Sequence, residues 1–166
     1  MPFVTSAVVL GLAAILQSAL LPHFAILGVK VNLVLLLVTS WSIRRGIESG
    51  LPWALIGGLA IDVLSVGPFG ASIVTFGIAA VIAGSVGPRF RQTSVLLPFT
   101  LIPLISIIAT LTSAFIMQAV GHTISWPIIV ATVILPSAVL DTLAILLVYP
   151  LVSLADHRMN TVEWPN

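Results

Sequence analysis

Residues 92–140 read QTSVLLPFTLIPLISIIATLTSAFIMQAVGHTISWPIIVATVILPSAVL and contain no aspartate, glutamate, lysine or arginine. A helix needs about 20 apolar residues to cross the hydrocarbon core of a bilayer, so this stretch is long enough for two crossings. The break between them is expected at Gly121 and His122, and the second helix opens at Trp126 and Pro127, because proline is tolerated in a first helical turn. The stretch therefore predicts two consecutive membrane-spanning helices.

The composition of the whole chain agrees with this interpretation. Of its 166 residues, 59% are hydrophobic and 7% are charged, whereas soluble domains carry about 25% charged residues. Disordered chains are poor in apolar residues and rich in charge, so disorder is excluded as well. The net charge of +1 gives no reason to expect nucleic acid as a partner. The sequence has no cysteine, which excludes disulfides, thiolate metal sites and a cysteine nucleophile.

Six apolar segments predict an all-α integral membrane protein, a six-transmembrane-helix bundle that forms one domain over residues 1–166. The first segment lacks the basic start of a signal peptide, so it is expected to be retained as a span. The second has only about 14 residues before Arg44, which is short for a full crossing, and its start is open between Ala25 and Val31. The predicted spans are about 2–21, 31–44, 51–66, 69–87, 95–120 and 126–154.

The basic residues predict the orientation of the bundle. With six spans, Lys30 alone falls on the side opposite the N-terminus. Cytoplasmic loops are enriched in lysine and arginine, so both termini are expected to be cytoplasmic. Trp41 and Trp126 lie near predicted span ends, where aromatic side chains contact the membrane interface. The basic residues on the N-terminal side are Arg44, Arg45, Arg89, Arg91 and Arg158.

Asp62 is one of two ionisable side chains within the predicted spans, where a charge costs a few kcal/mol and marks a candidate functional site. It shares a helix face with Gly50, Ala54 and Gly58, because the four residues recur at a spacing of four. Small residues allow another helix to approach closely, so Asp62 is expected to face a helix contact or a cavity. Two interpretations remain open: a structural contact with the headgroup region or with backbone amides of residues 65–68, or a contact with a ligand or partner.

Asp141 is the second ionisable residue within a span. It lies near the middle of the sixth span, one turn after Ser137 and just past Pro136, where the helix is expected to be tilted or kinked. No lysine or arginine lies within reach of the midplane to pair with it. Asp141 is therefore expected to be either protonated or hydrogen-bonded to hydroxyl and amide groups.

Polar side chains also form a loose layer in the outer half of the bundle. This layer either lines an outward-facing pocket or consists of separately satisfied interfacial residues. Its histidines and Asp62 come from three segments without a ligand motif, so no metal site is predicted. The sequence shows no phosphate loop, no His-Glu-x-x-His and no Gly-x-Ser-x-Gly, so no catalytic or cofactor-binding residue is predicted, and no enzyme. The members of the layer are Gln17, His23, Asp62, Gln118 and His122.

One stretch carries a more specific pattern than composition. RRG at 44–46 is followed by Gly50 and by GGLAIDVLSVGPFG at 57–70. This resembles the bacterial rod shape-determining MreD family, which shows a basic–glycine pair, a helix ending in Gly-Leu-x-x-Asp-x-x-Ser, and then Pro-Leu-Gly. The resemblance covers about residues 31–90, and the C-terminal half agrees in hydropathy. The chain departs from the family at 31–33, where Val-Asn-Leu stands in place of Pro-Asp/Asn-Leu.

The resemblance implies a partner and not a reaction. It implies a non-enzymatic scaffold without a cofactor, located in the bacterial inner membrane, that binds an MreC-like single-span protein. Through that protein the chain is expected to connect MreB filaments with the RodA glycosyltransferase and a penicillin-binding transpeptidase that build lateral peptidoglycan. The fold is expected to be similar to the S-components of energy-coupling-factor transporters.

Two alternative functions remain open. One is a vitamin-binding S-component, and the other is a small channel or flippase-like carrier. A vitamin-binding S-component typically carries Ala-x-x-x-Ala patterns in its first span. The first span here has a stripe of small residues that is not this repeat, namely Ala7, Gly11, Ala14 and Ser18. A polar vitamin also requires several aimed donors and acceptors, and the outer polar layer is sparse. A small channel or flippase-like carrier rests only on the two aspartates.

The fourth span is the expected docking face for the partner. Close packing of small residues drives helix association in a bilayer. The third span is assigned inward because it carries Asp62, whereas the fourth has small residues around a wide arc and no charge. The predicted contact residues are Gly77, Ala80 and Gly84, with Gly67, Pro68 and Gly70 of the preceding turn near their outer end.

Overall fold

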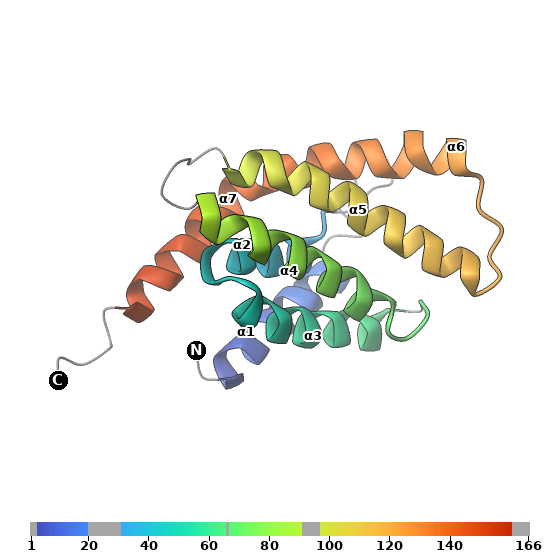
Figure 1. Ribbon diagram of the computed structural model, residues 1–166. Coiled ribbons are helices and arrows are strands. Elements are labelled where there is room, and N and C mark those ends of the chain that lie inside the picture. The colour runs from blue at the N-terminus through green and yellow to red at the C-terminus, as the bar shows by residue number, and fades with distance from the viewer. Residues whose placement is uncertain (1–2, 20–30, 66, 91–96, 161–166) are drawn as a thin grey trace.

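The computed structural model describes residues 3–19, 31–65, 67–90 and 97–160, and within these ranges all the regular structure is helical (Figure 1). The predicted all-helical class is confirmed. In chain order the elements are α1 (Phe3–Ala19), α2 (Leu33–Arg45), α3 (Ile47–Leu64), α4 (Ala71–Phe90), α5 (Leu97–Ala119), α6 (Trp126–Ile129), the π-helix η2 (Val130–Ile134) and α7 (Leu135–Asn160).

Four helical stretches are long and apolar enough to cross a membrane, and α1 adds a shorter apolar helix over 7–19. The last of the four runs through α6, η2 and α7 without a break. The multi-pass architecture expected from the sequence therefore stands. The long spans cover 47–64, 71–89, 99–119 and 126–154.

The irregularity expected at Pro136 is a π-helical turn directly before it. Proline has no N–H group to bond the carbonyl four residues earlier, and its ring crowds that carbonyl. In the π-helical turn Val130–Ile134, backbone N–H groups bond carbonyl groups five residues earlier instead of four. The N–H of Leu135, for example, donates to the carbonyl of Val130. The helix therefore continues past Pro136 without ending.

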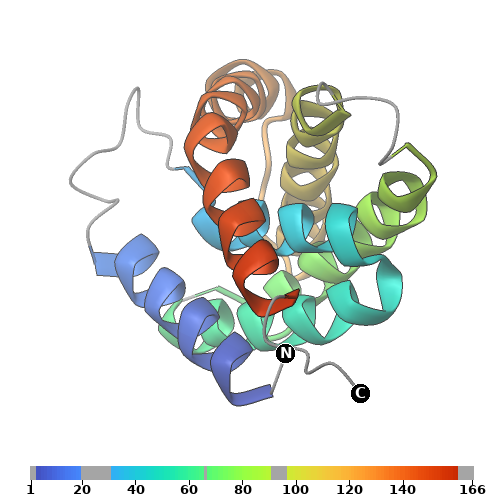
Figure 2. The ribbon, with the colours of Figure 1, turned by 90° about the vertical axis from the view of Figure 1, so that its left-hand side faces the viewer.

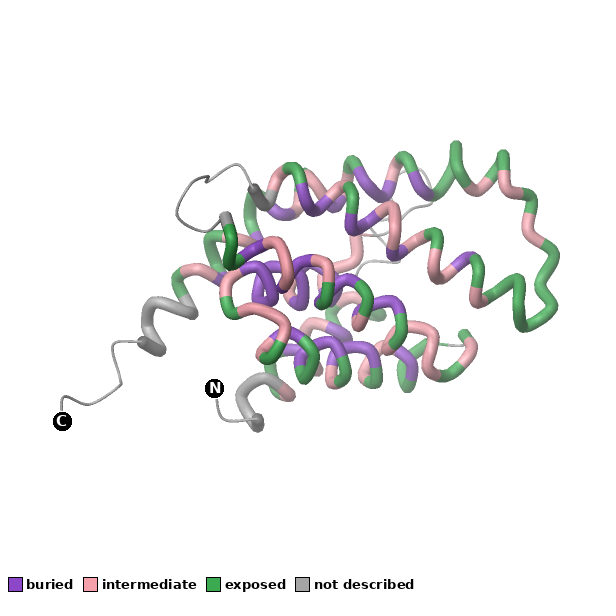
Figure 3. The backbone as a smooth tube through the Cα atoms, viewed as in Figure 1, coloured by how far each residue is buried: buried purple, intermediate pink, exposed green. Residues whose placement is uncertain are grey.

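Helix α2 lies at the centre of the bundle although it is the shortest of the main helices. It contacts α1, α3, α4, α5 and α7, and its 13 residues span only about 20 Å at 1.5 Å per residue. Its sequence is apolar or small on every face before Arg44, so no side has to meet water. Figure 3 shows this buried centre, and the buried residues are Val34, Leu35, Leu36, Val38, Thr39, Ser40, Trp41, Ser42 and Ile43.

A single residue, Gly46, separates α2 from α3. Its φ of +83° lies in the region that favours glycine, and its N–H group donates to the carbonyl of Ser42. The chain reverses at once, so α3 begins at Ile47, ahead of the predicted start near residue 51, and Pro52 lies inside the helix.

Glycines of α4 pack against this α2–α3 elbow. A Cβ atom on Gly84 would lie 2.6 Å from the backbone nitrogen of Ile47, and one on Gly87 would overlap the carbonyl oxygen of Ile43. Further along, a Cβ on Gly58 would lie 2.6 Å from the Cα of Ile73. Helices α2, α3 and α4 therefore meet backbone to backbone, which is how helices associate tightly in lipid.

Helix α3 divides into two faces one residue apart in register. The face containing Gly50, Ala54, Gly58 and Asp62 is buried. The adjacent face is exposed and consists of large apolar side chains suited to lipid contact, namely Leu51, Leu55, Leu59 and Val63.

The prediction that Trp41 contacts the membrane interface is wrong. Trp41 is 3% exposed and stacks on Trp53 of α3, with ring centroids 4.5 Å apart and planes 9° from parallel. The guanidinium carbon of Arg45 lies 5.6 Å from the centroid of the Trp41 ring. The aromatic pair therefore fixes α2 against α3 beside the elbow.

The beginning of α1 and the ends of α2, α4 and α7 lie at the same end of the bundle (Figure 1). Arg44 and Arg45 close α2, and Arg89 closes α4, so the described arginine side chains gather at that end. Lys30 and Arg91, which were also used to predict the orientation of the bundle, lie outside the described residues.

We expect Gly87→Ala to lower the free energy of unfolding by about 1–3 kcal/mol, because the added methyl group overlaps the α2 backbone. Gly11→Ala is the matched control. It has no neighbour within 4 Å and replaces glycine by a better helix former, so it should leave stability unchanged or raise it by about 0.5–1 kcal/mol. Thermal unfolding of the detergent-solubilised variants measures both. Equal melting temperatures for the two variants would contradict the proposed packing.

Candidate functional site

The carboxyl group of Asp141 joins three helices near the middle of the bundle. Its Oδ1 accepts a hydrogen bond from the backbone N–H of Asn32 at 3.0 Å, just before α2. Its Oδ2 accepts from the hydroxyl of Ser106 on α5 at 2.6 Å. Ser137, the polar neighbour one turn earlier, donates instead to the carbonyl of Ile134. Asp141 is 2% exposed, so these two bonds define its surroundings.

Asn32 and Gln17 complete the same network. The Oδ1 of Asn32 accepts from the N–H of Leu35 at 3.1 Å, which is an N-cap bond, and from the Nε2 of Gln17 at 3.2 Å. The Oε1 of Gln17 accepts from the N–H of Val34 at 3.0 Å. We call Gln17, Asn32, Ser106 and Asp141 the α2 cap.

The α2 cap explains how α2 begins inside the bundle. The first amide groups of a helix have no partner within it, and in a hydrocarbon interior water is not available to bond them. Here Asp141, Gln17 and Asn32 accept from the amides of residues 32, 34 and 35. An acidic side chain at a helix start is also favoured by the helix dipole.

Asp62 performs the same task for α4. Its Oδ2 accepts from the N–H of Gly70 at 2.8 Å, and its Oδ1 accepts from the N–H of Ser72 at 3.0 Å. The structural interpretation named amides of residues 65–68, and the structure corrects those partners. Gly70 has a φ of +95°, which turns the chain back over the end of α3 and brings the start of α4 onto Asp62.

Both membrane aspartates are thus bonded to the starts of other helices. Each carboxyl oxygen already accepts a hydrogen bond from a described residue. Among the described residues, no group of three or more His, Asp or Glu side chains is arranged to hold a metal ion. The two carboxyl groups therefore have a structural role, because they accept hydrogen bonds from the amides at the starts of α2 and α4.

The other described members of the predicted outer layer do not join this network. Gln118 and His122 are exposed near the end of α5, and His23 lies outside the described residues. Of the described members of that layer, only Gln17 and Asp62 are bonded to helix starts.

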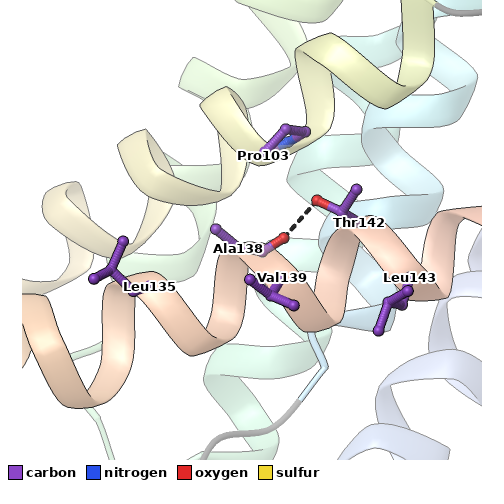
Figure 4. Close-up of a pocket in the computed structure, with 6 residues that line it drawn as sticks. All are labelled: Pro103, Leu135, Ala138, Val139, Thr142 and Leu143. Carbon is purple, nitrogen blue, oxygen red and sulfur yellow. Dashed lines mark hydrogen bonds between the residues drawn. The ribbon is translucent and has the colours of Figure 1, made fainter.

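Two grooves of the described surface are apolar. One of about 340 Å³ lies between α5 and α7 (Figure 4), where the hydroxyl of Thr142 already donates to the carbonyl of Ala138. A second, of about 490 Å³, lies among α4, α5 and α6. Neither presents the set of free polar groups that orients a polar ligand. The residues that line the first are Pro103, Leu135, Ala138, Val139, Thr142 and Leu143, and those that line the second are Val74, Leu111, Thr112, Phe115, Ile116 and Trp126.

The predicted docking residues on α4 divide into two groups. Ala80 is 0% exposed and Gly84 packs against the elbow, so the expectation that they lie on an exposed face is wrong. A Cβ atom on Gly77 would have no neighbour within 4 Å. In the preceding turn Gly67 is exposed, and Pro68 and Gly70 are partly so.

The sequence matches the family model of the rod shape-determining protein MreD over residues 1–155. The chain belongs to the MreD family. It is therefore a multi-pass membrane protein with a role in determining rod shape, in a family of structural proteins. No curated protein and no solved structure matches the chain, so the similarity to S-components stays a prediction.

Two residues of the α2 cap in this MreD-family chain, Asn32 and Ser106, were not predicted from the sequence. Asn32 carried a usable signal, because asparagine directly before an apolar run is a preferred N-cap residue. Ser106 carried none, since it is one of several hydroxyl residues in α5, and some of them bond their own helix. Thr110 and Thr112, for example, donate to carbonyl groups four residues earlier.

The two aspartates should respond differently to replacement by asparagine. In Asp141→Asn the amide oxygen can accept from Asn32, and the new NH₂ group can donate to the Ser106 oxygen, because a hydroxyl also accepts. In Asp62→Asn one of the two backbone N–H donors must face the NH₂ group and loses its acceptor. We expect Asp141→Asn to be close to neutral, and Asp62→Asn to lower the free energy of unfolding by about 1–3 kcal/mol.

Asp141→Leu provides the comparison at the first site, since it leaves Asn32 and Ser106 without an acceptor and should also cost about 1–3 kcal/mol. Unfolding of purified protein in detergent measures all three variants. A large loss of activity in Asp141→Asn, with normal expression and assembly, would show that the charge itself is required.

Proposed function

We propose that this chain is a non-enzymatic scaffold of the bacterial cell-elongation complex in the inner membrane. It binds an MreC-like single-span protein. Through that protein it connects MreB filaments with a RodA glycosyltransferase and a penicillin-binding transpeptidase, and so supports lateral peptidoglycan synthesis. The observation that carries the proposal is the match to the MreD family over nearly the whole chain.

The use of the buried carboxylates supports a scaffold. In transporters and intramembrane enzymes, an acidic side chain within a span commonly faces the substrate or ion pathway. Asp62 and Asp141 instead accept hydrogen bonds from helix starts, and the two grooves described above are apolar. These features favour a rigid bundle that presents surfaces to other membrane proteins over the alternative of a vitamin-binding subunit.

We place the partner helix on α4 at Gly77. The backbone there is open to the membrane, and glycine allows a neighbouring helix to approach closely. Val74, Ile78 and Val81 surround it with exposed apolar side chains. The turn with Gly67 and Pro68 lies beyond the outer end of this face, whereas Ala80 and Gly84 form the inner face of the same helix.

Gly77→Leu should reduce co-purification of the MreC-like partner by about tenfold or more, equivalent to ~1.4 kcal/mol, without lowering the yield of folded protein. Gly11→Leu is the matched control, because Gly11 is also open to the membrane but lies on α1. Gly84→Leu should lower the folded yield itself. Full retention of the partner by Gly77→Leu would remove α4 as the docking face and leave the scaffold function intact.

The same purification tests the function. We expect a stoichiometric single-span protein and no small ligand. A stoichiometric vitamin without a protein partner would instead establish an S-component and overturn the scaffold proposal.

Both termini are proposed to be cytoplasmic, which places the α2–α3 elbow on the same side. Glu48 lies in the first turn of α3 and His122 lies after α5, and both are exposed. In this cysteine-free chain, Glu48→Cys should react with a membrane-impermeant reagent only from the cytoplasmic side, and His122→Cys only from the opposite side. The reverse pattern would invert the proposed orientation.

A further inference from the structure

Helix α1 is the least embedded helix of the bundle. Among the described helices it contacts only α2 and α3, and Figure 2 shows it at the side of the assembly. Among its described side chains, Leu10 and Ala14 are fully buried, whereas Val8, Val9, Leu12, Ile15 and Leu16 are 40–63% exposed. In lipid, exposed apolar area does not drive a helix back onto a bundle. Specific contacts must therefore hold α1 in place.

Helix α1 packs along α3, and its described contacts with the start of α2 lie at two levels. Near the middle of α1, Leu10 lies over Gly57 of α3, where a Cβ atom would be 3.5 Å from the leucine and 2.7 Å from Val34 of α2. Near its end, Gln17 makes two hydrogen bonds, one to the Asn32 side chain and one from the Val34 amide. Both polar contacts end on the first turn of α2.

Asp141 holds the same turn from the opposite side. It bonds the backbone N–H of Asn32, and it is itself fixed by Ser106 of α5. Asn32 is therefore the shared element, since its side chain meets α1 and its backbone meets α7. Helices α1 and α7 make no contact with each other within the described ranges.

We infer that α1 is a releasable helix whose docked position is set by Asp141, which it does not touch, through Asn32. When the bond from Asn32 to Asp141 is absent, the first turn of α2 is no longer fixed, and the acceptor and the donor that bond Gln17 move away from it. Helix α1 then separates from α2, while α2 to α7 stay packed through the glycine contacts of the elbow. By linkage, a partner that engages α1 and one that engages the α5–α7 pair influence each other's affinity.

Distance measurements between paired spin labels on the full chain in lipid nanodiscs test this inference. Leu12→Cys on α1 and Leu147→Cys on α7 are both exposed, at 63% and 72%, and they report the α1–α7 separation. Leu59→Cys on α3, paired with Leu147→Cys, is the control for the body of the bundle. The labels are introduced into the unaltered chain and into Gln17→Met, Asp141→Leu and Asp141→Asn.

We expect one narrow α1–α7 distance in the unaltered chain and in Asp141→Asn. Gln17→Met and Asp141→Leu should each add a second, longer distance, and the double variant should add no more than either single change. The α3–α7 distance should stay narrow throughout. If Asp141→Leu does not fold, Asp141→Ser replaces it, since serine is one bond too short to reach the position of the carboxyl oxygens.

Three results would overturn the inference. The first is an unchanged α1–α7 distance in Gln17→Met or in the Asp141 variant that folds. The second is an additive effect in the double variant, which would mean that the two residues act independently. The third is equal broadening of the α3–α7 control, which would show loss of the whole bundle instead of release of α1.

Discussion

A helix that begins within a membrane protein requires acceptors for its first amide groups, and the position of α2 depends on this requirement. Water cannot supply them in the hydrocarbon region. The structure supplies them from α1, from α7 and from Asn32 itself. Because the start of α2 is satisfied in this way, a helix too short to cross the bilayer can occupy the centre of the bundle and contact five others.

Close backbone contact is the second constraint, and it acts at the opposite end of α2. Gly46 reverses the chain in one residue, and Gly84 and Gly87 allow α4 to lie directly on the elbow. The stacked rings of Trp41 and Trp53 fill the space between α2 and α3 there. Polar bonds thus fix one end of the central helix, and glycines with an aromatic pair fix the other.

Much of this arrangement follows from residue patterns along the chain. The apolar segments predicted the helices, and the few residues before Arg44 predicted a short α2. Isolation from basic residues predicted that Asp141 is either protonated or hydrogen-bonded to hydroxyl and amide groups. Burial of Trp41 was not predictable, because position near a span end does not reveal that Trp53 lies beside it. The same limit applies to Ala80 and Gly84, since a small residue is compatible with an inner or an outer face. Ser106 becomes identifiable only once α5 and α7 are packed together.

The hydrogen bond between Asn32 and Asp141 connects residues that are 109 positions apart, and this separation has a consequence for biosynthesis. During translation the first turn of α2 emerges long before the carboxyl group that it requires. Until the last span is inserted, the amide of Asn32 lacks the carboxyl group of Asp141 as its acceptor. A nascent chain that stops before residue 141 lacks that acceptor, which is a structural difference between incomplete chains and finished ones.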